Sequence, residues 1–329
     1  MSSNKVITIS IAAYNVEKYL REAIDSLIDD RIIDDIEVFV IDDGGIDNSY
    51  NIAKEYELRY PQSIRAVHKD NGGYGSTVNY SIKNATGKYF KLLDGDDWFD
   101  KEQFVKLVEL LRGIDVDAVF TKFTKVYKDK IETAINYDYN ICDKILNVAS
   151  FDLNEATPMH TLTYRTSALR ACKLSLKEHM LYTDNQYVAI PFINVNTIYF
   201  TNINVYNYRL EVLGQSVDKN SLIKHIDESR DISLELAKFY SENVNDSVMA
   251  KEYIRKNIAS TCDNYVAAIM KMPIGVIPLD RLKNFDRDIK SISTEIYDSM
   301  MNLNRKCAKV LKIIRCSRYT LYWIFALFN

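Results

Sequence analysis

Short apolar runs alternate with amphipathic segments through the first 120 residues of the chain. The apolar runs have the length and β-branched character of buried strands, and they cover residues 6–13, 36–41, 63–68 and 88–93. The segments between them repeat apolar residues at helical spacing, and they cover residues 16–28, 48–59 and 76–84. Strands that alternate with helices favour right-handed crossovers and a mainly parallel sheet covered on both faces. We therefore predict a doubly wound, Rossmann-like α/β domain.

The pattern is less regular in the second half of the chain. Residues 119–139 resemble strand and hairpin material, and residues 183–192 resemble the start of a helix. Long stretches of helical periodicity follow at residues 221–268 and 282–314. We predict an α/β domain over residues 1–220 and a mostly helical region over residues 221–329.

Composition places the chain among ordinary globular proteins. It has 329 residues, 47% of them hydrophobic, with ten glycines and five prolines. The five cysteines are widely spaced and form no C-x-x-C pair, which argues against a zinc site or a disulfide framework. The first residues lack the pattern of a signal peptide. These features predict a cytoplasmic location.

Charge is distributed unevenly along the chain. The net charge is −3, yet residues 303–329 contain six basic residues and no acidic one. This tail ends in an aromatic-rich apolar stretch at residues 319–328, which is far shorter than the roughly 20 residues that span a bilayer. It predicts either an interfacial helix at the inner face of the cell membrane or a helix docked on protein, including a second subunit of a homo-oligomer. Nucleic acid is not an expected partner, because the rest of the chain is acidic and has no basic stripe.

Three carboxylates follow the apolar run 88–93: Asp94, Asp96 and Asp97. Like charges at this density repel unless a cation or a polyhydroxylated ligand lies between them. The carboxyl ends of parallel strands meet at one edge of a sheet, where α/β proteins bind ligands. The loops at residues 13–15, 42–44 and 94–97 should therefore face one pocket.

The loop after the first strand excludes two common nucleotide-binding motifs. Ala12–Asn15 stands where a dinucleotide-binding G-x-G-x-x-G or a P-loop would lie, which weakens dehydrogenase, kinase and nucleotidyltransferase interpretations. A nucleotide can still bind through its base and ribose. Asp43 can accept the imide N–H of a uracil, Tyr14 can pack on the ring, and Asp94 and Asp96 can take the ribose and a divalent cation.

Four segments resemble the family 2 glycosyltransferases of the GT-A fold, which are inverting enzymes that use nucleotide-diphospho sugars. The segments are residues 12–20, 40–49, 71–73 and 94–98. The resemblance implies a GT-A fold followed by a mostly helical C-terminal region. It also implies nucleotide-binding roles for Ala12, Tyr14, Asp43, Gly73, Asp94 and Gly95. It assigns Mn²⁺ or Mg²⁺ to Asp94 and Asp96, with Asp96 as the favoured direct ligand.

The remaining assignments follow weaker similarities. Asp184 corresponds to the Asp of the family's E-D pair and is the expected catalytic base, although an Asp at this place can also serve as a helix N-cap. Residues 158–165 resemble the family's P-W-x-K-L-Y-R segment, which implies possible donor or acceptor contacts for His160 and Arg165. Many members place an Arg where this chain has Val78, so Lys69 or the metal would have to neutralise the diphosphate.

The sequence therefore predicts a metal-dependent inverting glycosyltransferase. It would move a hexose or N-acetylhexosamine from a nucleotide-diphospho sugar, with a uridine diphosphate sugar as the expected donor, to a hydroxyl of a bacterial surface glycan or a lipid-linked acceptor. The alternative is a catalytically silent module that binds a nucleotide within a glycan assembly complex.

Overall fold

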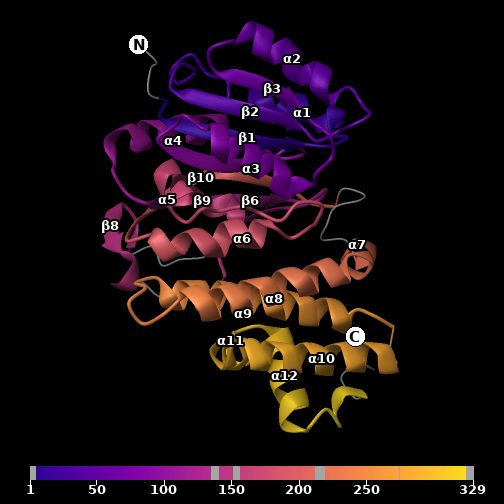
Figure 1. Cartoon of the computed structure of the whole chain (residues 1–329). Helices are drawn as coiled ribbons and strands as arrows, with labels where there is room; N and C mark the ends of the chain where they lie inside the picture. The colour runs from indigo at the N-terminus through magenta and orange to yellow at the C-terminus, as the bar shows by residue number, and fades with distance from the viewer. Residues whose placement is uncertain (1–4, 135–140, 151–155, 212–218, 274, 324–329) are drawn as a thin grey trace. The chain divides into compact units, whose positions relative to one another are not determined.

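A computed structural model describes residues 5–134, 141–150, 156–211, 219–273 and 275–323 (Figure 1). The described residues form two compact units. The first unit lies within Met1–Phe151, Pro158–Asp184 and Asn194–Glu211, and the second lies within Asp152–Thr157, Asn185–Ile193 and Val212–Asn329. The sequence predicted a single boundary near residue 220, whereas the chain already contributes two short segments to the second unit before that point.

A mixed sheet forms the centre of the first unit. The described part of this sheet has ten strands, with the order β3-β2-β1-β4-β9-β6-β10-β5, while β7 pairs with β6 and β8 pairs with β10. The strands are β1 Ile7–Ala13, β2 Ile36–Asp42, β3 Ile64–His68, β4 Tyr89–Asp94, β5 Trp98–Phe99, β6 Ala118–Val126, β7 Ile131–Ala134, β8 Lys144–Asn147, β9 Leu162–Arg165 and β10 Thr197–Arg209. The pairs among β1 to β4 are parallel, as are β6 and β10, whereas β9 runs antiparallel to both of its neighbours.

Helices cover both faces of this sheet. They are α1 Glu17–Asp25, α2 Ser49–Arg59, α3 Tyr74–Asn84, α4 Lys101–Gly113 and α5 Thr166–Ala171. Alternate residues of β1, including Ile9 and Ile11, share one apolar core with α1, α2 and α4. Ser10 faces the other way, and its hydroxyl bonds that of Ser81 in α3 at 2.8 Å. The predicted α/β class is confirmed.

The strand register brings three predicted loops to one edge. In the β1–β2 pair Ala13 lies opposite Asp42, and in the β1–β4 pair Ala12 lies opposite Asp94. All three strands end within two residues of these positions and run in the same direction. The loops at residues 13–15, 42–44 and 94–97 therefore leave the same edge of the sheet, as predicted.

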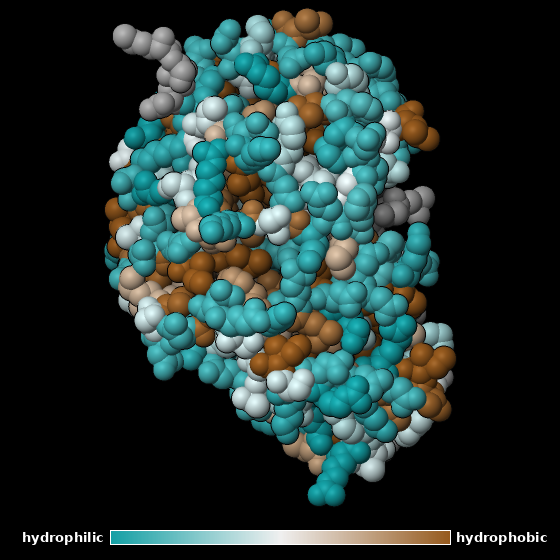
Figure 2. All heavy atoms as spheres, in the orientation of Figure 1, coloured by the Kyte–Doolittle hydropathy of each residue, from teal (hydrophilic) through white to brown (hydrophobic). Residues whose placement is uncertain are grey.

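The second unit is helical, as the periodicity predicted. Its helices are α6 Asp184–Ala189, α7 Lys219–Lys224, α8 Ile226–Asn243, α9 Lys251–Met270, α10 Val276–Ile292, α11 Thr294–Met300 and α12 Lys306–Cys316. The first residue of α6 is the last residue of a segment of the first unit. None of the helices in the described part of the chain is long and apolar enough to cross a membrane. Hydrophilic side chains cover most of the face shown in Figure 2, with hydrophobic side chains in smaller groups.

Candidate active site

The acidic loop after β4 is fixed by the end of β10. Asp97 is only 1% exposed, and its Oδ2 accepts a hydrogen bond of 2.7 Å from the Tyr206 hydroxyl. Its Oδ1 accepts one of 2.7 Å from the backbone N–H of Arg209. The Tyr206 hydroxyl also accepts a bond of 3.1 Å from the backbone N–H of Asp94. Two residues of β10 thus set the shape of the loop that carries Asp94, Asp96 and Asp97.

The side chain of Arg209 ties this loop to α1. Its Nε donates to the backbone oxygen of Asp96 at 2.8 Å, and its Nη2 donates to Glu22 Oε2 at 2.6 Å. The guanidinium lies 4.4 Å from the ring centre of Trp98 and 4.9 Å from that of Tyr19. Such contacts hold the cation in place on two sides.

The sequence analysis missed Tyr206 and Arg209 because it did not predict β10. The signal was present: residues 197–209 are rich in β-branched and aromatic residues, which favour strands. Interspersed asparagines made the stretch look irregular.

Gly95 allows the acidic loop to lie against the first strand. Its N–H donates to the backbone oxygen of Ala12 at 3.1 Å. A Cβ at this position would lie 2.7 Å from that oxygen and 2.9 Å from Val16 Cγ2, which is too close for any larger residue. The glycine between the two aspartates is therefore required by packing.

Four carboxylates, Asp94, Asp96, Asp97 and Asp184, form the carboxylate cluster. Burial and the charges of Asp96 and Asp184 raise the pKa of Asp94 to about 8, and a hydrogen bond with Tyr74 offsets part of this effect. Burial and the charges of Asp94 and Asp96 raise the pKa of Asp97 well above its usual range. The cluster thus crowds four carboxyl groups together, and burial with mutual repulsion disfavours the charged forms of Asp94 and Asp97.

Asp184 belongs to this cluster although it lies 90 residues from Asp94 in the chain. It is the first residue of α6, and its charge contributes to the raised pKa of both Asp94 and Tyr208. For Tyr208, burial is the larger cause, followed by the charges of the other cluster members. The structure therefore brings the predicted base into the electrostatic range of the acidic loop.

His160 lies beside the cluster in an aromatic cage. Its ring centre is 4.4 Å from that of Tyr208, 4.6 Å from that of Tyr206 and 5.2 Å from that of Phe123. Both ring nitrogens are buried and have no hydrogen-bond partner among the residues that the structure describes. Burial, with smaller contributions from Lys91 and Lys125, lowers the pKa of the imidazole to about 3, so the ring is neutral and can donate a lone pair.

Lys91 holds the backbone of this segment. The fully buried ammonium donates to the carbonyl oxygens of His160 at 2.8 Å and Leu162 at 3.1 Å. Burial lowers the pKa of Lys91 to about 7. This side chain therefore links β4 to the turn that presents His160.

The residues at this place suit a divalent cation. One oxygen or nitrogen of each of Asp94, Asp97 and His160 lies within 4.8 Å of the other two. Asp94 Oδ1 is buried, and it has no hydrogen-bond partner in the described part of the chain. Carboxylate and neutral imidazole are suitable ligands for Mn²⁺, while Mg²⁺ prefers oxygen. Asp97 is the least available of the three, because each of its oxygens already accepts a hydrogen bond. Of the two predicted metal residues, this group contains Asp94 but not Asp96, and it adds Asp97 and His160.

Asp43 organises the loop that follows β3. Its Oδ1 accepts from Lys69 Nζ at 2.7 Å and from the N–H of Gly72 at 3.0 Å, and its Oδ2 accepts from the N–H of Gly73 at 2.7 Å. Lys69 is therefore engaged with Asp43, which argues against its suggested role at the diphosphate. Tyr14 is 55% exposed beside this loop edge, as a ring that packs on a base requires.

The same loop supports the segment that leads to Asp184. Gly73 has a φ of +77°, in the region that favours glycine, and the His179 N–H donates to the Gly72 oxygen at 2.5 Å. A Cβ at Gly75 would overlap the carbonyl oxygen of Lys177. The close approach of residues 72–75 to residues 177–179 thus depends on glycine.

Arg165 lies away from the cluster. In the antiparallel β4–β9 pair it is opposite Tyr89, at the end of β4 distant from Asp94, which is roughly 16 Å along a strand. It pairs with Asp115 at 2.7 Å and with Asp117 at 3.4 Å. The structure therefore does not place Arg165 where it would contact a donor at the acidic loop.

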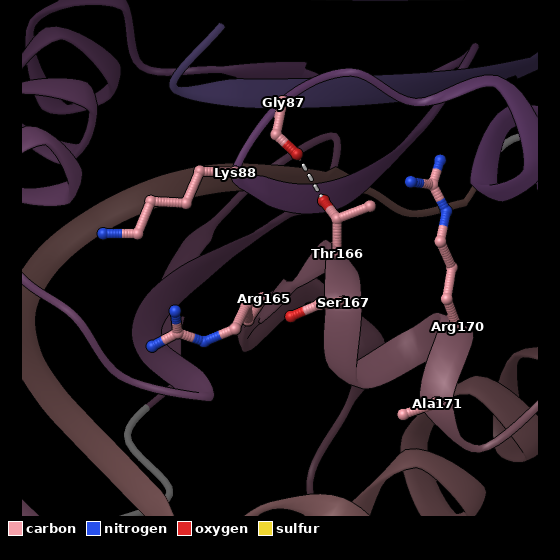
Figure 3. A pocket seen from close by; sticks show the side chains of 7 residues that line it. All are labelled: Gly87, Lys88, Arg165, Thr166, Ser167, Arg170 and Ala171. Carbon is pink, nitrogen blue, oxygen red and sulfur yellow. Dashed lines mark hydrogen bonds between the residues drawn. The ribbon is translucent and has the colours of Figure 1, made fainter. Parts of the chain in front are cut away.

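Arg165 instead lines a cavity of about 540 Å³ at that opposite end of β4 (Figure 3). The other lining residues are Gly87, Lys88, Thr166, Ser167, Arg170 and Ala171. The Thr166 hydroxyl bonds the Gly87 oxygen at 2.6 Å, Lys88 pairs with Asp115 at 3.0 Å, and Arg170 donates to backbone oxygens. Its three cations thus already contact protein oxygens, and the cavity lies at the end of β4 distant from the acidic loop.

A mostly parallel sheet with helices on both faces, followed by a helical C-terminal region, is the architecture of the GT-A glycosyltransferases. Residues 8–177 match glycosyl transferase family 2, and this match covers more than half of the chain. The chain belongs to this family.

Similar proteins carry related descriptions. An uncharacterized glycosyltransferase of Mycoplasma pneumoniae is 27% identical over 244 residues, which is 72% of this chain and 80% of that protein. The minor teichoic acid biosynthesis protein GgaB of Bacillus subtilis is 32% identical over 168 residues, which is 50% of this chain but 18% of GgaB. A structure of S. aureus TarS 1-349 in complex with UDP-GlcNAc superposes with a TM-score of 0.60, covering 95% of this chain and 92% of TarS 1-349. At 16% identity, the last similarity concerns the fold.

Proposed function

We propose that this protein transfers a sugar, with inversion, from a uridine diphosphate donor to a hydroxyl of a cell-surface glycan or a lipid-linked acceptor. The observation that carries the proposal is the interaction between the charge of Asp184 and Asp94 in the acidic loop that follows β4. The UDP-GlcNAc complex of TarS and the teichoic acid role in the name of GgaB support the choice of donor and acceptor class.

The nucleotide would lie along the carboxyl edge of the sheet. Asp43 follows β2 and Asp94 ends β4, and β1 lies between these strands, so about 10 Å separates the two positions. A nucleoside can span this distance, with its base near Tyr14 and Asp43 and its ribose near Asp94. The single hydrogen bond at Asp43 Oδ2 leaves that oxygen capacity for an imide N–H.

Asp94, with Asp96 and His160, would hold the Mn²⁺ or Mg²⁺ ion. The bound cation supplies charge stabilisation for the leaving diphosphate, where negative charge grows during transfer. Ionisation of Asp94 at neutral pH requires such a partner, because burial and the neighbouring carboxylates otherwise raise its pKa to about 8.

Asp184 would accept the proton of the attacking hydroxyl. Inverting transfer is a single displacement, so the attacking oxygen approaches from the side opposite the diphosphate, and a carboxylate on that side is needed to take its proton. Asp184 is the first residue of α6 and does not belong to the strand loops that would hold the donor. It therefore suits a base that acts on the acceptor side.

The test is metal-dependent turnover of uridine diphosphate sugars by the purified chain. We expect sugar release from at least one of UDP-glucose, UDP-galactose and UDP-GlcNAc with Mn²⁺ or Mg²⁺, and loss of release with EDTA. Asp184→Asn should lower turnover by about 10²- to 10⁴-fold, as general-base removal does, while donor affinity changes little.

Asp30→Asn is a matched control, because Asp30 is an exposed carboxylate of the same unit. Donor binding without sugar release under any of these conditions would instead identify a catalytically silent nucleotide-binding module.

A further inference from the structure

One face of α12 docks on its own unit. Ala308, Leu311 and Ile314 are fully buried, and the buried Arg315 donates from Nε to Asp286 Oδ2 at 2.9 Å. The Arg315 guanidinium also lies 3.8 Å from the Tyr297 ring centre. The sequence predicted that the basic tail either lies at a membrane or docks on protein, and this face of α12 docks on protein.

The opposite face carries cations that the fold does not use. Lys306, Lys309 and Lys312 are exposed at intervals of three residues, and Ile313 lies among them with 44% of its surface exposed. Residues spaced three and four apart share one side of a helix, so these four form a continuous strip, which we call the lysine face.

The lysine face has no acidic partner in the described residues. None of its lysines lies within 4.0 Å of a described carboxylate, whereas Arg305 and Arg315 of the same segment pair with Asp263 and Asp286. Two basic residues of the tail, Arg305 and Arg315, therefore bind the helix to its own unit, while the three lysines face outward.

An exposed aromatic residue follows the lysine face. Trp323 is 41% exposed, while the adjacent Tyr322 is buried at 2% and holds this end of the described chain to the unit. Arg318, between α12 and Trp323, is exposed and also has no described acidic partner. Lysines and an exposed Trp within one short segment of the chain are the combination that enters the boundary between lipid head groups and acyl chains.

We propose that the lysine face, with Trp323, binds the surface of an anionic lipid bilayer. The lysines attract acidic head groups, and Ile313 and Trp323 supply the apolar contact that a soluble polyanion would not use. The helix lies along the surface because its other face remains bound to protein. This surface acts independently of the carboxylate cluster, which belongs to the other unit.

Vesicle sedimentation of the full chain tests the proposal. We expect binding to vesicles that contain phosphatidylglycerol, weak binding to pure phosphatidylcholine, and weakening by salt. A basic residue near an anionic leaflet changes affinity by roughly fivefold, so K306Q/K309Q/K312Q should bind about 100-fold more weakly.

The matched control is K83Q/K101Q/K106Q, which removes three exposed lysines from the other unit and changes the net charge equally. All six side chains are exposed, so both variants should keep the melting temperature of the wild type. Both should also keep the wild-type rate of donor turnover, so a failure of the membrane proposal is separate from a failure of the proposed activity.

Tryptophan emission gives an independent readout, since the chain contains only Trp98 and Trp323. A blue shift on anionic vesicles that Trp323→Phe abolishes is the expected result. Equal binding of the two triple variants, no binding of the wild type to anionic vesicles, or binding to a single-stranded oligonucleotide but not to vesicles would each overturn the proposal.

Discussion

The hydroxyl of Tyr206 joins the two ends of the acidic loop, because it donates to Asp97 Oδ2 at 2.7 Å and accepts from the Asp94 backbone at 3.1 Å. Tyr206→Phe keeps the buried ring but removes both bonds. We expect the free energy of unfolding to fall by about 1–2 kcal/mol, since a buried carboxylate oxygen loses its donor. Donor turnover should also fall, because Asp94 is no longer held by β10.

Thermal melting and steady-state kinetics measure the two effects. Tyr80→Phe is the control, because Tyr80 is exposed on α3 and its hydroxyl makes no bond that positions the loop. Unchanged kinetics in the Tyr206 variant would show that the loop keeps its shape without this residue.

Asp94→Asn should stabilise the metal-free protein in a pH-dependent manner. The folded state raises the pKa of Asp94 from 3.8 to about 8, so folding favours the protonated form. The stability that this carboxyl contributes is present below the unfolded pKa and is lost as pH rises toward 8. Asparagine resembles the protonated acid, so we expect a gain of about 2 kcal/mol at pH 8 and almost none at pH 4. Chemical denaturation at both pH values, in EDTA, measures the difference, and an equal effect at both would contradict it.

His160→Phe tests the imidazole as a cation ligand. Phenylalanine preserves the contacts with Phe123, Tyr206 and Tyr208 and removes only the two nitrogens. We expect Mn²⁺ affinity to fall by about 10- to 100-fold, which is the usual effect of losing a residue that supports a metal site. The melting temperature should change little. Calorimetric titration measures this change, with His225→Phe in the other unit as the control. Wild-type affinity in the His160 variant would assign the ring to packing.

Gly75→Ala should destabilise the protein, although alanine is the better helix former by about 1 kcal/mol. The new Cβ would overlap the carbonyl oxygen of Lys177, so the segment leading to Asp184 would have to move. We expect a loss of about 2 kcal/mol and a reduced kcat. Gly113→Ala at the end of α4 is the control, since its Cβ would meet nothing within 4 Å. Equal melting temperatures for the two variants would refute the close approach of the loops.

Arg315→Met should cost about 3–5 kcal/mol, because it leaves the Asp286 carboxylate buried without its cation. These side chains are 4% and 3% exposed. Adding Asp286→Asn removes the charge while an oxygen still accepts from the Tyr319 hydroxyl, so the double variant should recover much of the loss. A double-mutant cycle in urea measures the coupling, and additive effects would contradict it.

The elements of the parallel half of the sheet could be predicted because each signal is local. Residues 36–41, for example, are apolar except for Glu37, and the structure places a strand at Ile36–Asp42. Parallel pairing then determines that the loop after each strand leaves the same edge. Asp43 and Asp94 could therefore be assigned to one edge from sequence.

The other half of the sheet depends on strand direction, which periodicity does not reveal. Arg165 and His160 are close in the chain, yet β9 runs antiparallel to β4, so Arg165 lies toward the opposite end from Asp94 while His160 remains beside the acidic loop. Tyr206 and Arg209 act through a strand whose neighbours, β6 and β5, are distant in sequence. Non-local pairing of this kind decided which side chains could reach the loop.

The position of β10 in the chain has a consequence for biosynthesis. A ribosome that has released residues 1–98 has already produced the loops at residues 13–15, 42–44 and 94–97, but it has yet to translate Tyr206 and Arg209. Nascent chains of that length lack the groups that hold the acidic loop, so we expect the loop to take its folded shape only after Arg209 has left the exit tunnel.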